Sequence, residues 1–184
     1  MKKMSKFLSV IFMATGLTLA QKPDFHPNQL APYVPSPHQI VDRMLELAKI
    51  KPGEKLYDLG SGDGRVVIAA AQKYEAKAVG IELSSRLVKS SQEEIKRLGL
   101  ASNASVVHGD VFDADLSDAD VVILYLMRDS NNTLKPKLEK MLKPGARVIS
   151  HDYAIEGWKP QAEEKVDAFR RNHKIYVYRM PPQK

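Results

Sequence analysis

Three glycines alternate in the segment over residues 58–64, which reads Asp-Leu-Gly-Ser-Gly-Asp-Gly. A short apolar run over residues 55–59 leads into this segment, and a helical pattern begins at about Arg65. Glycine permits tight turns and lets the backbone come close to a bound molecule. A glycine-rich turn between a strand and a helix is typical of sites that bind nucleotide-containing cofactors.

The spacing of the glycines discriminates between cofactors. A dinucleotide site needs G-x-G-x-x-G/A, and its last position falls on Arg65, which disfavours a nicotinamide oxidoreductase. No Lys-Ser/Thr pair follows the turn, which excludes a phosphate-binding P-loop. What remains is Asp58 two positions before Gly60, followed by Gly62 and Gly64 in a G-x-G-x-G turn.

Acidic residues also follow the next two predicted strands. Glu82 ends the strand predicted over residues 76–82, where a carboxylate can accept hydrogen bonds from both hydroxyls of a ribose. Asp110, followed by Val111, comes just after the strand predicted over residues 104–108. Each acid alone could be a surface or turn carboxylate. Three acids at three consecutive strand ends predict one ligand cradle.

Strand and helix patterns alternate along the rest of the chain, which predicts βαβ units and a mostly parallel sheet. We expect a single doubly wound, Rossmann-like α/β domain over residues 36–184, with an antiparallel hairpin at the sheet edge. The expected helices cover residues 37–48, 65–74, 84–98 and 133–142; the expected strands cover residues 55–59, 76–82, 104–108, 120–126 and 147–151, and the hairpin residues 165–169 and 174–180.

Two local features refine this expectation. Ser36 is predicted to cap the first helix, with Gln39 completing a Ser-x-x-Gln capping box. Pro136 is predicted to lie in the first turns of its helix, because proline removes a hydrogen bond farther inside.

The composition is that of an ordinary globular protein with room for one domain: 184 residues, 43% hydrophobic and 27% charged. The formal net charge is +6, and Lys2, Lys3 and Lys6 supply half of it. No long Lys/Arg block occurs elsewhere, so we expect no nucleic-acid-binding face. The absence of cysteine excludes disulfides, thiolate metal sites and a cysteine nucleophile, and we expect no metal.

The N-terminus carries a different pattern. In residues 1–20 a basic head precedes an uncharged stretch that ends in Thr-Leu-Ala, which is typical of a secretory signal. This segment predicts export or membrane tethering; the alternative is the N-terminal helix or frayed tail of a cytoplasmic protein. Residues 21–35 hold four prolines without any period and predict an extended linker.

The turn over residues 58–64 resembles motif I of class I S-adenosylmethionine (SAM)-dependent methyltransferases. Further segments are similar to the archaeal protein-lysine methyltransferases and, more distantly, to the mitochondrial enzyme that methylates a lysine of the ATP synthase rotor (c) protein. The resemblance covers about residues 31–180 and is carried by residues 33–37, 57–65, 78–82, 124–126, 136–139, 150–151, 157–160 and 173–176.

The resemblance implies SAM as the cofactor and lysine ε-amino groups of a protein as the acceptor. It places Asp58 at the methionine end of SAM and Asp110 at the adenine amino group. The residues expected to bind SAM are Asp58, Gly60, Ser61, Gly62, Gly64, Glu82, Asp110 and Val111.

Transfer to lysine needs a neutral amine, although free lysine has a pKa of about 10.4. A narrow apolar channel beside a sulfonium lowers that pKa, so aromatic side chains and hydrogen-bond acceptors are expected there. Tyr33 lies in residues 33–37, a segment that resembles the family's lid over the cofactor, and Tyr125 follows the fourth predicted strand; these two are the expected catalytic residues. His151 and Trp158 are expected to face the substrate. Ordinary packing, or for His151 a structural hydrogen bond, remains an alternative for each.

Two further activities remain open. A class I methyltransferase of this size could instead act on a small molecule. The chain could also be a SAM-binding module without transferase activity.

Overall fold

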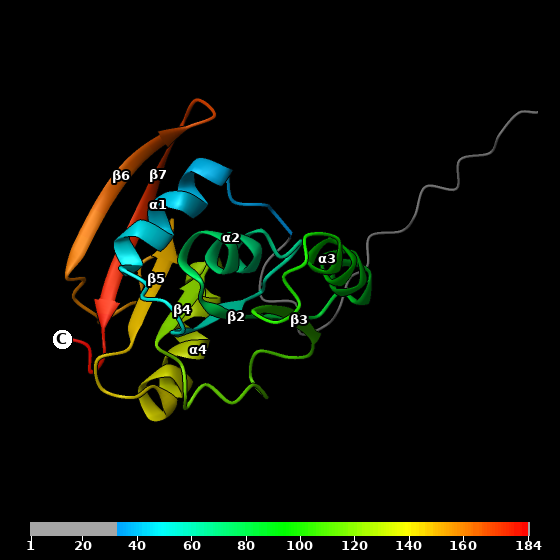
Figure 1. Cartoon of the computed structure of the whole chain (residues 1–184). Coiled ribbons are helices and arrows are strands. Elements are labelled where there is room, and N and C mark those ends of the chain that lie inside the picture. Colours follow the sequence, from blue (N-terminus) through cyan, green and yellow to red (C-terminus); the bar gives the residue numbers. More distant parts are fainter. Residues whose placement is uncertain (1–32, 184) are drawn as a thin grey trace, which may run out of the picture.

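The computed structural model describes residues 33–183, and a seven-stranded sheet forms its centre (Figure 1). The strand order is β3-β2-β1-β4-β5-β7-β6, with the first five strands parallel and β6 and β7 antiparallel at one edge. The elements are β1 (Lys55–Leu59), β2 (Lys77–Glu82), β3 (Ala104–His108), β4 (Val121–Leu124), β5 (Arg147–His151), β6 (Ala162–Ala168), β7 (Arg171–Arg179), α1 (His38–Ala48), α2 (Arg65–Tyr74), α3 (Ser85–Arg97) and α4 (Arg128–Met141). The expected doubly wound α/β fold is confirmed.

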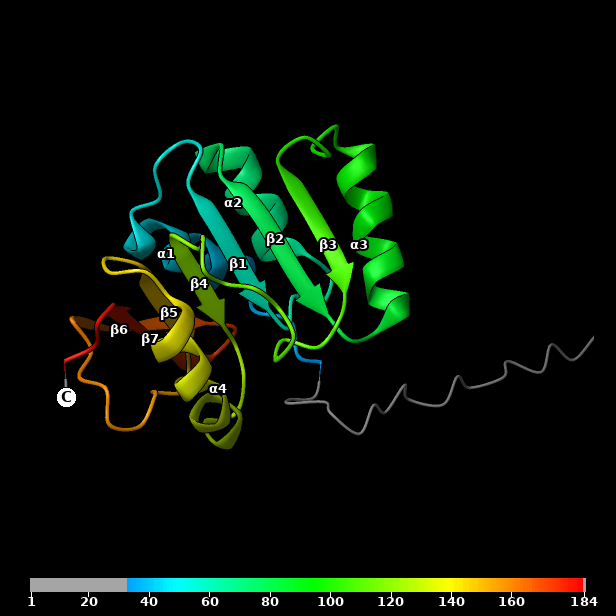
Figure 2. The same ribbon diagram turned by 90° about the horizontal axis from the view of Figure 1, so that it is seen from below.

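Helices cover both faces of the sheet. Helices α1, α2 and α3 lie on one face and α4 lies on the other, as Figures 1 and 2 show. Two apolar clusters fill the space between these layers, one under α1–α3 and one under α4. Every residue of β4 is buried because both of its faces are covered, which explains its uninterrupted Val-Val-Ile-Leu sequence.

The parallel register brings the carboxyl ends of the strands to one edge of the sheet. Asp58 pairs with Gly80 of β2 and with Ile123 of β4, and Glu82 pairs with His108 of β3. The strand order reverses between β1 and β4, and ligands of doubly wound sheets bind outside the strand ends at this reversal. The glycine-rich turn lies at this point.

The last helix begins earlier than its sequence indicates. Helix α4 starts at Arg128 instead of at about residue 133, so the expectation that Pro136 lies in its first turns is wrong. Tertiary contacts hold the extra turn, since the fully buried Asn131 donates from Nδ2 to Ser150 Oγ (3.2 Å) and to the Tyr153 carbonyl (3.0 Å). These bonds override the local cost of the proline.

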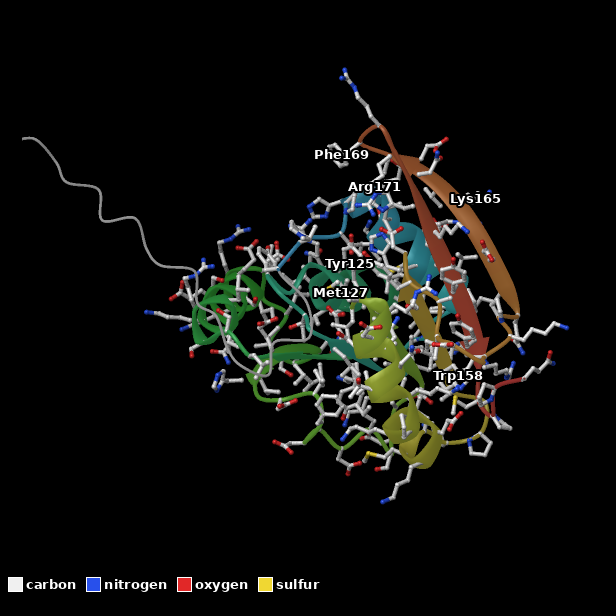
Figure 3. All side chains as sticks on the ribbon, turned by 180° about the vertical axis from the view of Figure 1, so that it is seen from behind. Tyr125, Met127, Trp158, Lys165, Phe169 and Arg171 are labelled. Atoms are coloured by element: carbon white, nitrogen blue, oxygen red, sulfur yellow. The ribbon has the colours of Figure 1, made fainter. Side chains whose placement is uncertain are left out.

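The edge hairpin is longer and its turn tighter than predicted. Strands β6 and β7 pair from Ala168↔Arg171 outward, and only Phe169 and Arg170 connect them. Both connecting residues have left-handed backbones, with φ 49° and 61°. Phe169 stands at the tip of the hairpin (Figure 3) and is 85% exposed.

The entry to α1 also differs from the expected capping box. Pro37 occupies the N-cap position of α1, without a side-chain cap. The hydroxyl of Ser36 lies instead 2.9 Å from Nδ1 of His151, 115 residues farther along the chain. The predicted cap is therefore wrong, because a buried polar partner competes for the same hydroxyl.

Two predictions concern residues outside the described part of the chain. The signal-like segment over residues 1–20 lies there, as does most of the linker predicted over residues 21–35. Within residues 33–183, no helix has both the length and the apolar character that crossing a membrane requires.

Candidate functional site

The glycine-rich turn satisfies most of its own backbone donors. The amide groups of Gly60 and Ser61 both donate to the Ile81 carbonyl, at 2.9 and 3.0 Å, and that of Gly64 donates to the Ser61 carbonyl. The amide of Gly62 donates to Glu82 Oε2 at 2.8 Å. A phosphate site needs such amide groups directed at the ligand. The turn is therefore suited to a ligand that presents no phosphate, which agrees with its glycine spacing.

Two glycines make room that a larger residue would fill. A Cβ atom added to Gly62 would lie 2.6 Å from Cε2 of Tyr33, and Gly62 has φ 56°. A Cβ added to Gly80 would overlap the side chain of Ser61. The Ser61 hydroxyl is buried without a hydrogen-bond partner in the described part of the protein. The turn thus forms a close-packed cradle that keeps one unsatisfied polar atom.

Acidic side chains line this cradle. Asp58 is buried, and burial, together with the negative charges of Glu82 and Asp63, raises its pKa to about 8. Glu82 accepts from the Gly62 and Ser84 amides, one on each oxygen. A carboxylate has about four acceptor positions, so Glu82 can accept further bonds from a ligand. A cationic group bound here would favour the ionised form of Asp58.

The third strand end contributes Asp110 and Val111. Asp110 Oδ1 accepts from the Phe112 amide at 2.9 Å, which shapes the turn after β3. Val111 is buried against the apolar cluster under α4. The parallel register places both residues at the same sheet edge as Asp58 and Glu82.

The segment before α1 folds over the glycine-rich turn. Arg65 holds it there, since its guanidinium pairs with Asp63 and donates from Nη1 to the Ser36 carbonyl at 2.7 Å. The Tyr33 ring lies against Gly62, and burial and the neighbouring Asp63 raise the pKa of the Tyr33 hydroxyl. Residues 33–36 therefore pack over the glycine-rich turn, and we call them the cover segment.

Tyr125 immediately precedes a residue that packs against the same turn. A Cβ on Gly60 would lie 3.2 Å from Leu126, so the segment after β4 packs directly against the cradle. The Tyr125 ring stacks on the ring of His151, with centroids 3.8 Å apart. The structure thus places Tyr33 against the glycine-rich turn and Tyr125 next to Leu126, which also contacts that turn.

Below Tyr125 lies a buried polar network that sequence reasoning missed. His151 Nε2 lies 2.8 Å from His173 Nδ1, and His173 Nδ1 lies 3.1 Å from Asp152 Oδ2. His173 could have been found from strand periodicity: it shares a face with Ile175, which pairs with His151. The sequence separation of 22 residues hid this proximity.

These three side chains also lie close enough to surround one ion, with their ligand atoms within 4.8 Å of one another. The guanidinium of Arg171, however, lies 3.1 Å from Asp152 Oδ2 and already supplies a positive charge there. Repulsion from that charge disfavours a metal cation. Hydrogen bonding among the side chains accounts for the cluster.

Two expected substrate-facing residues lie elsewhere. Trp158 is only 5% exposed; its ring packs edge-on against Tyr178 and its Nε1 donates to Glu139 Oε1 at 2.9 Å. It belongs to the core under α4, and Figure 3 shows it well away from Tyr125. His151 is fully buried beneath Tyr125, so it supports the site from below and does not face a substrate. Both predictions are corrected by burial.

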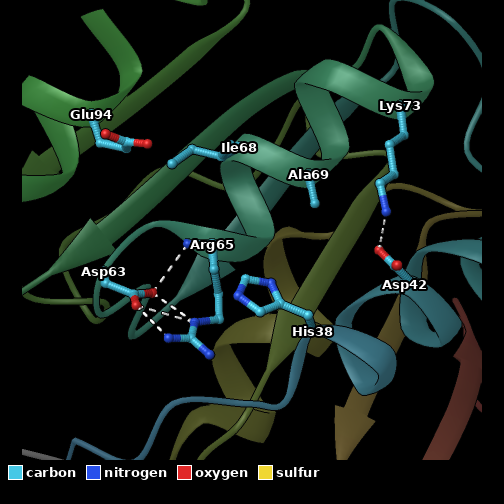
Figure 4. A pocket seen from close by; sticks show the side chains of 8 residues that line it. All are labelled: His38, Asp42, Asp63, Arg65, Ile68, Ala69, Lys73 and Glu94. Atoms are coloured by element: carbon cyan, nitrogen blue, oxygen red, sulfur yellow. Dashed lines mark hydrogen bonds and ion pairs between the residues drawn. The ribbon is translucent and has the colours of Figure 1, made fainter. Parts of the chain in front are cut away.

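A cavity of about 420 Å³ lies outside this cradle, beside α2 (Figure 4). Asp63 and Arg65 form one wall, and an ion pair between Lys73 and Asp42 closes the opposite side. The strand-end acids Asp58, Glu82 and Asp110 are not among the residues that line it. We place the site at the cradle because Asp58 and Glu82 lie close enough there for their charges to interact, beside the turn that holds the unsatisfied Ser61 hydroxyl.

A family model matches more than half of the chain. The model of the ANTKMT methyltransferase domain matches residues 58–162, from the acid of the glycine-rich turn to the start of β6. A protein-lysine N-methyltransferase of Saccharolobus islandicus (strain REY15A) is 45% identical over 148 residues, which cover 80% of this chain and 92% of that protein. The adenine nucleotide translocase lysine N-methyltransferase of Mus musculus is 35% identical over 131 residues, which cover 71% of this chain and 57% of that protein.

A solved structure resembles the whole described domain. It is the crystal structure of an RNA methyltransferase from Salinibacter ruber in complex with S-adenosyl-L-homocysteine. The TM-score is 0.75 with 43% sequence identity, over 82% of this chain and 96% of that one. The description of this neighbour names a different acceptor from that of the relatives matched by sequence.

Proposed function

The chain belongs to the ANTKMT methyltransferase family, and we propose that it methylates lysine ε-amino groups of a protein with SAM as the donor. The observation that carries this proposal is the coincidence of the family match with the cradle. The matched segment holds the glycine-rich turn, all three strand-end acids and Tyr125. The relatives matched by sequence at 45% and 35% identity are both named lysine N-methyltransferases.

The residues of the cradle fit SAM. SAM supplies a methyl group on a positively charged sulfur and carries no phosphate, which suits a turn whose amide groups are already paired. We assign Asp58 to the cationic methionine end, Glu82 to the ribose hydroxyls and Asp110 to the adenine amino group. Gly60, Ser61, Gly62 and Gly64 form the floor, and Val111 forms an apolar wall.

The acceptor amine enters between the two tyrosines in this proposal. Methyl transfer is an in-line displacement, so the chain contributes mostly by positioning, which can supply about 7–11 kcal/mol of the barrier. Tyr33 covers the cradle and excludes water, while Tyr125 presents its hydroxyl beside the strand end. Burial and the negative charge of Asp152 raise the pKa of Tyr125, so its hydroxyl is neutral and can accept a hydrogen bond from the amine.

RNA methylation is the second candidate, because the Salinibacter ruber neighbour is an RNA methyltransferase at 43% identity. The charge distribution favours a protein acceptor. Half of the net charge of +6 comes from Lys2, Lys3 and Lys6, and no long basic run lies in the domain. The two relatives named above also act on lysine according to their names.

The test is incubation of the full chain with methyl-labelled SAM and a host lysate, followed by separation of protein, RNA and low-mass fractions. We expect label in protein, removed by protease and resistant to ribonuclease. Label in RNA alone would establish the second candidate, and label in the low-mass fraction alone would establish a small-molecule acceptor. SAM binding without any transfer would identify a binding module.

The N-terminal segment bears on where the enzyme meets its substrate. From its sequence pattern we propose that residues 1–20 direct export or tether the domain to a membrane. N-terminal sequencing of the protein from its native source tests this, since an intact Met1 in a protein that washes free of membranes contradicts both.

A further inference from the structure

The hydroxyl of Tyr125 lies next to a buried group of polar side chains that begins with Asp152. It lies 3.5 Å from Asp152 Oδ2, a separation that is long for a hydrogen bond. Catalytic hydrogen bonds are often this long before the substrate binds. Behind Asp152 the polar contacts continue through His173 and His151 to Ser36. We call these four residues the Asp152 network.

The carboxylate of Asp152 favours one direction for the bonds of the network. Asp152 Oδ2 can only accept when it is ionised and lies 3.1 Å from His173 Nδ1, so the tautomer of His173 that satisfies this contact carries its proton on Nδ1. His151 then accepts on Nε2 and donates from Nδ1 to Ser36 Oγ. The two ring N–H groups, on His173 Nδ1 and His151 Nδ1, each face an acceptor in this arrangement, whereas the other tautomer of His173 would set a lone pair against the carboxylate.

Burial keeps the network in this state. His151 has no exposed surface, and desolvation lowers its pKa to about 4, so it is neutral near pH 7. Burial alone would raise the pKa of Asp152, but the hydrogen bonds from the Lys174 amide and from His173 hold it below the ordinary value. The network therefore ends, on the Tyr125 side, in a carboxylate.

The backbone of Asp152 is shaped for this position. Its φ is 62°, a left-handed conformation that Asp and Asn tolerate better than most other residues. The turn directs Oδ1 to the Lys174 amide (2.9 Å) and Oδ2 toward Tyr125, His173 and Arg171. Such local strain is often kept where a side chain must point at a functional group.

We propose that the Asp152 network orients Tyr125 and accepts, through the Tyr125 hydroxyl, the proton that the lysine ammonium must lose before methylation. This inference rests on the proposed function. The ammonium N–H bond breaks and its electron pair stays on nitrogen; the proton passes to Tyr125 Oη while the phenolic proton passes to Asp152 Oδ2. Asp152, His173 and His151 are positioning residues, because they act through Tyr125.

The charged and titratable groups around the network come from every neighbouring segment. Tyr125 follows β4, His151 ends β5, and Asp152 and Tyr153 follow β5. Arg171, His173 and Lys174 come from β7. Arg171 partly offsets the carboxylate, so Asp152 does not simply stabilise the ammonium form of the acceptor. A neutral phenol between amine and carboxylate can pass a proton on without itself becoming charged.

The test compares the full chain with Asp152→Asn, a change that keeps the shape and the tolerance of a left-handed backbone while removing the charge. Single-turnover transfer from labelled SAM to lysine in ribonuclease-treated host lysate protein is measured from about pH 6 to 10. We expect the rate near pH 7 to fall by about 100-fold, the size of a general-base contribution. We also expect the acid limb to move upward by at least about one pH unit, with SAM affinity unchanged.

Three further comparisons sharpen the result. Asp167→Asn removes an exposed carboxylate of the same hairpin and should match the wild type. The double variant Tyr125→Phe with Asp152→Asn should be no slower than Tyr125→Phe alone, because both changes interrupt one path. His173→Asn keeps a donor near Nδ1 and should retain more activity than His173→Leu.

The outcomes separate this inference from the proposed function. If the wild-type protein transfers no label to lysine, both the proposed function and the role of the Asp152 network are overturned. If it does transfer label, the variants test the Asp152 network alone. An Asp152→Asn rate lowered equally at every pH would show a structural role and overturn the network proposal alone. So would stoichiometric zinc in the purified protein whose removal abolishes transfer.

Discussion

His173 Nδ1 lies 2.8 Å from His151 Nε2, across the antiparallel pairing of β7 with β5. Both side chains are buried on the face of the sheet that α1 covers, and Ser36, just before α1, completes the contact. Residues 33–36 and Tyr125 are thus joined by one chain of polar contacts that runs through His151, His173 and Asp152. Movement of residues 33–36 when a ligand binds would reach Tyr125 through His151.

Asp58 makes the cradle sensitive to pH. Its pKa is about 8 in the folded protein against about 3.9 in an unfolded chain, so the folded state holds the proton more tightly. Stability therefore falls, through this group, as pH rises from about 4 to 8. Asp58→Asn should remove this dependence and raise stability at pH 8 by about 1–3 kcal/mol, while weakening SAM binding strongly.

Thermal unfolding of Asp58→Asn and wild type at about pH 5 and pH 8 checks this, with Asp167→Asn as the exposed control. Equal destabilisation of Asp58→Asn at both pH values would contradict this prediction. It would show that Asp58 stabilises the fold, and not that its buried carboxylate destabilises the fold and serves ligand binding. Calorimetric titration with SAM supplies the second readout.

Gly62 is predicted to be less replaceable than Gly99, although both have left-handed backbones. A Cβ on Gly62 meets the Tyr33 ring, whereas nothing lies within 4 Å of a Cβ on Gly99. Both alanine variants should lose about 1 kcal/mol from backbone strain. Only Gly62→Ala should also weaken SAM binding, because its Cβ would displace the Tyr33 ring that packs over the turn.

Tyr33→Ala in the Gly62→Ala background removes the clash. Isothermal titration should then show a smaller effect of Gly62→Ala than in the wild-type background. Additive losses would mean that Tyr33 and Gly62 do not act on the ligand through their contact.

The sequence was sufficient for much of the fold and for placing the strand-end acids at one edge of the sheet, because both depend on local signals. The strand boundaries of β1 and β3, the α2 start at Arg65 and the converging strand-end acids follow from glycine spacing and apolar runs. The burial of Trp158 and the contacts of the Asp152 network could not be predicted from such local signals. Whether Trp158 faces solvent or core depends on α4 packing over it, and His173 meets His151 only through the register of β7.

Trp158→Phe tests the correction for that residue. It removes the indole that donates to Glu139 and packs on Tyr178, so we expect a loss of about 1–3 kcal/mol in unfolding free energy. Because the ring lies in the core, the KM for the acceptor should stay unchanged. A raised KM for the acceptor with an unchanged free energy of unfolding would contradict the core position of Trp158 and show that it contacts the substrate.

The hairpin tip offers a gain in stability. A two-residue turn with two left-handed residues favours Asn-Gly, yet Phe169 and Arg170 occupy it. Phe169 is 85% exposed and loses little packing on replacement. The double change Phe169→Asn with Arg170→Gly should raise the free energy of unfolding by about 1–2 kcal/mol in denaturant titrations. A lower free energy of unfolding in this double variant would show that Phe169 or Arg170 makes stabilising contacts that outweigh the backbone strain of the turn.

The most direct test of the central claim is the chemical identity of the methylated residue. Lysate protein labelled by the full chain with methyl-labelled SAM is hydrolysed completely, and the labelled amino acids are separated. We predict that the label elutes as methylated lysine and disappears when Asp58→Asn replaces the wild type. Label on any other amino acid, or on nucleosides only, would contradict the assignment of lysine as the acceptor.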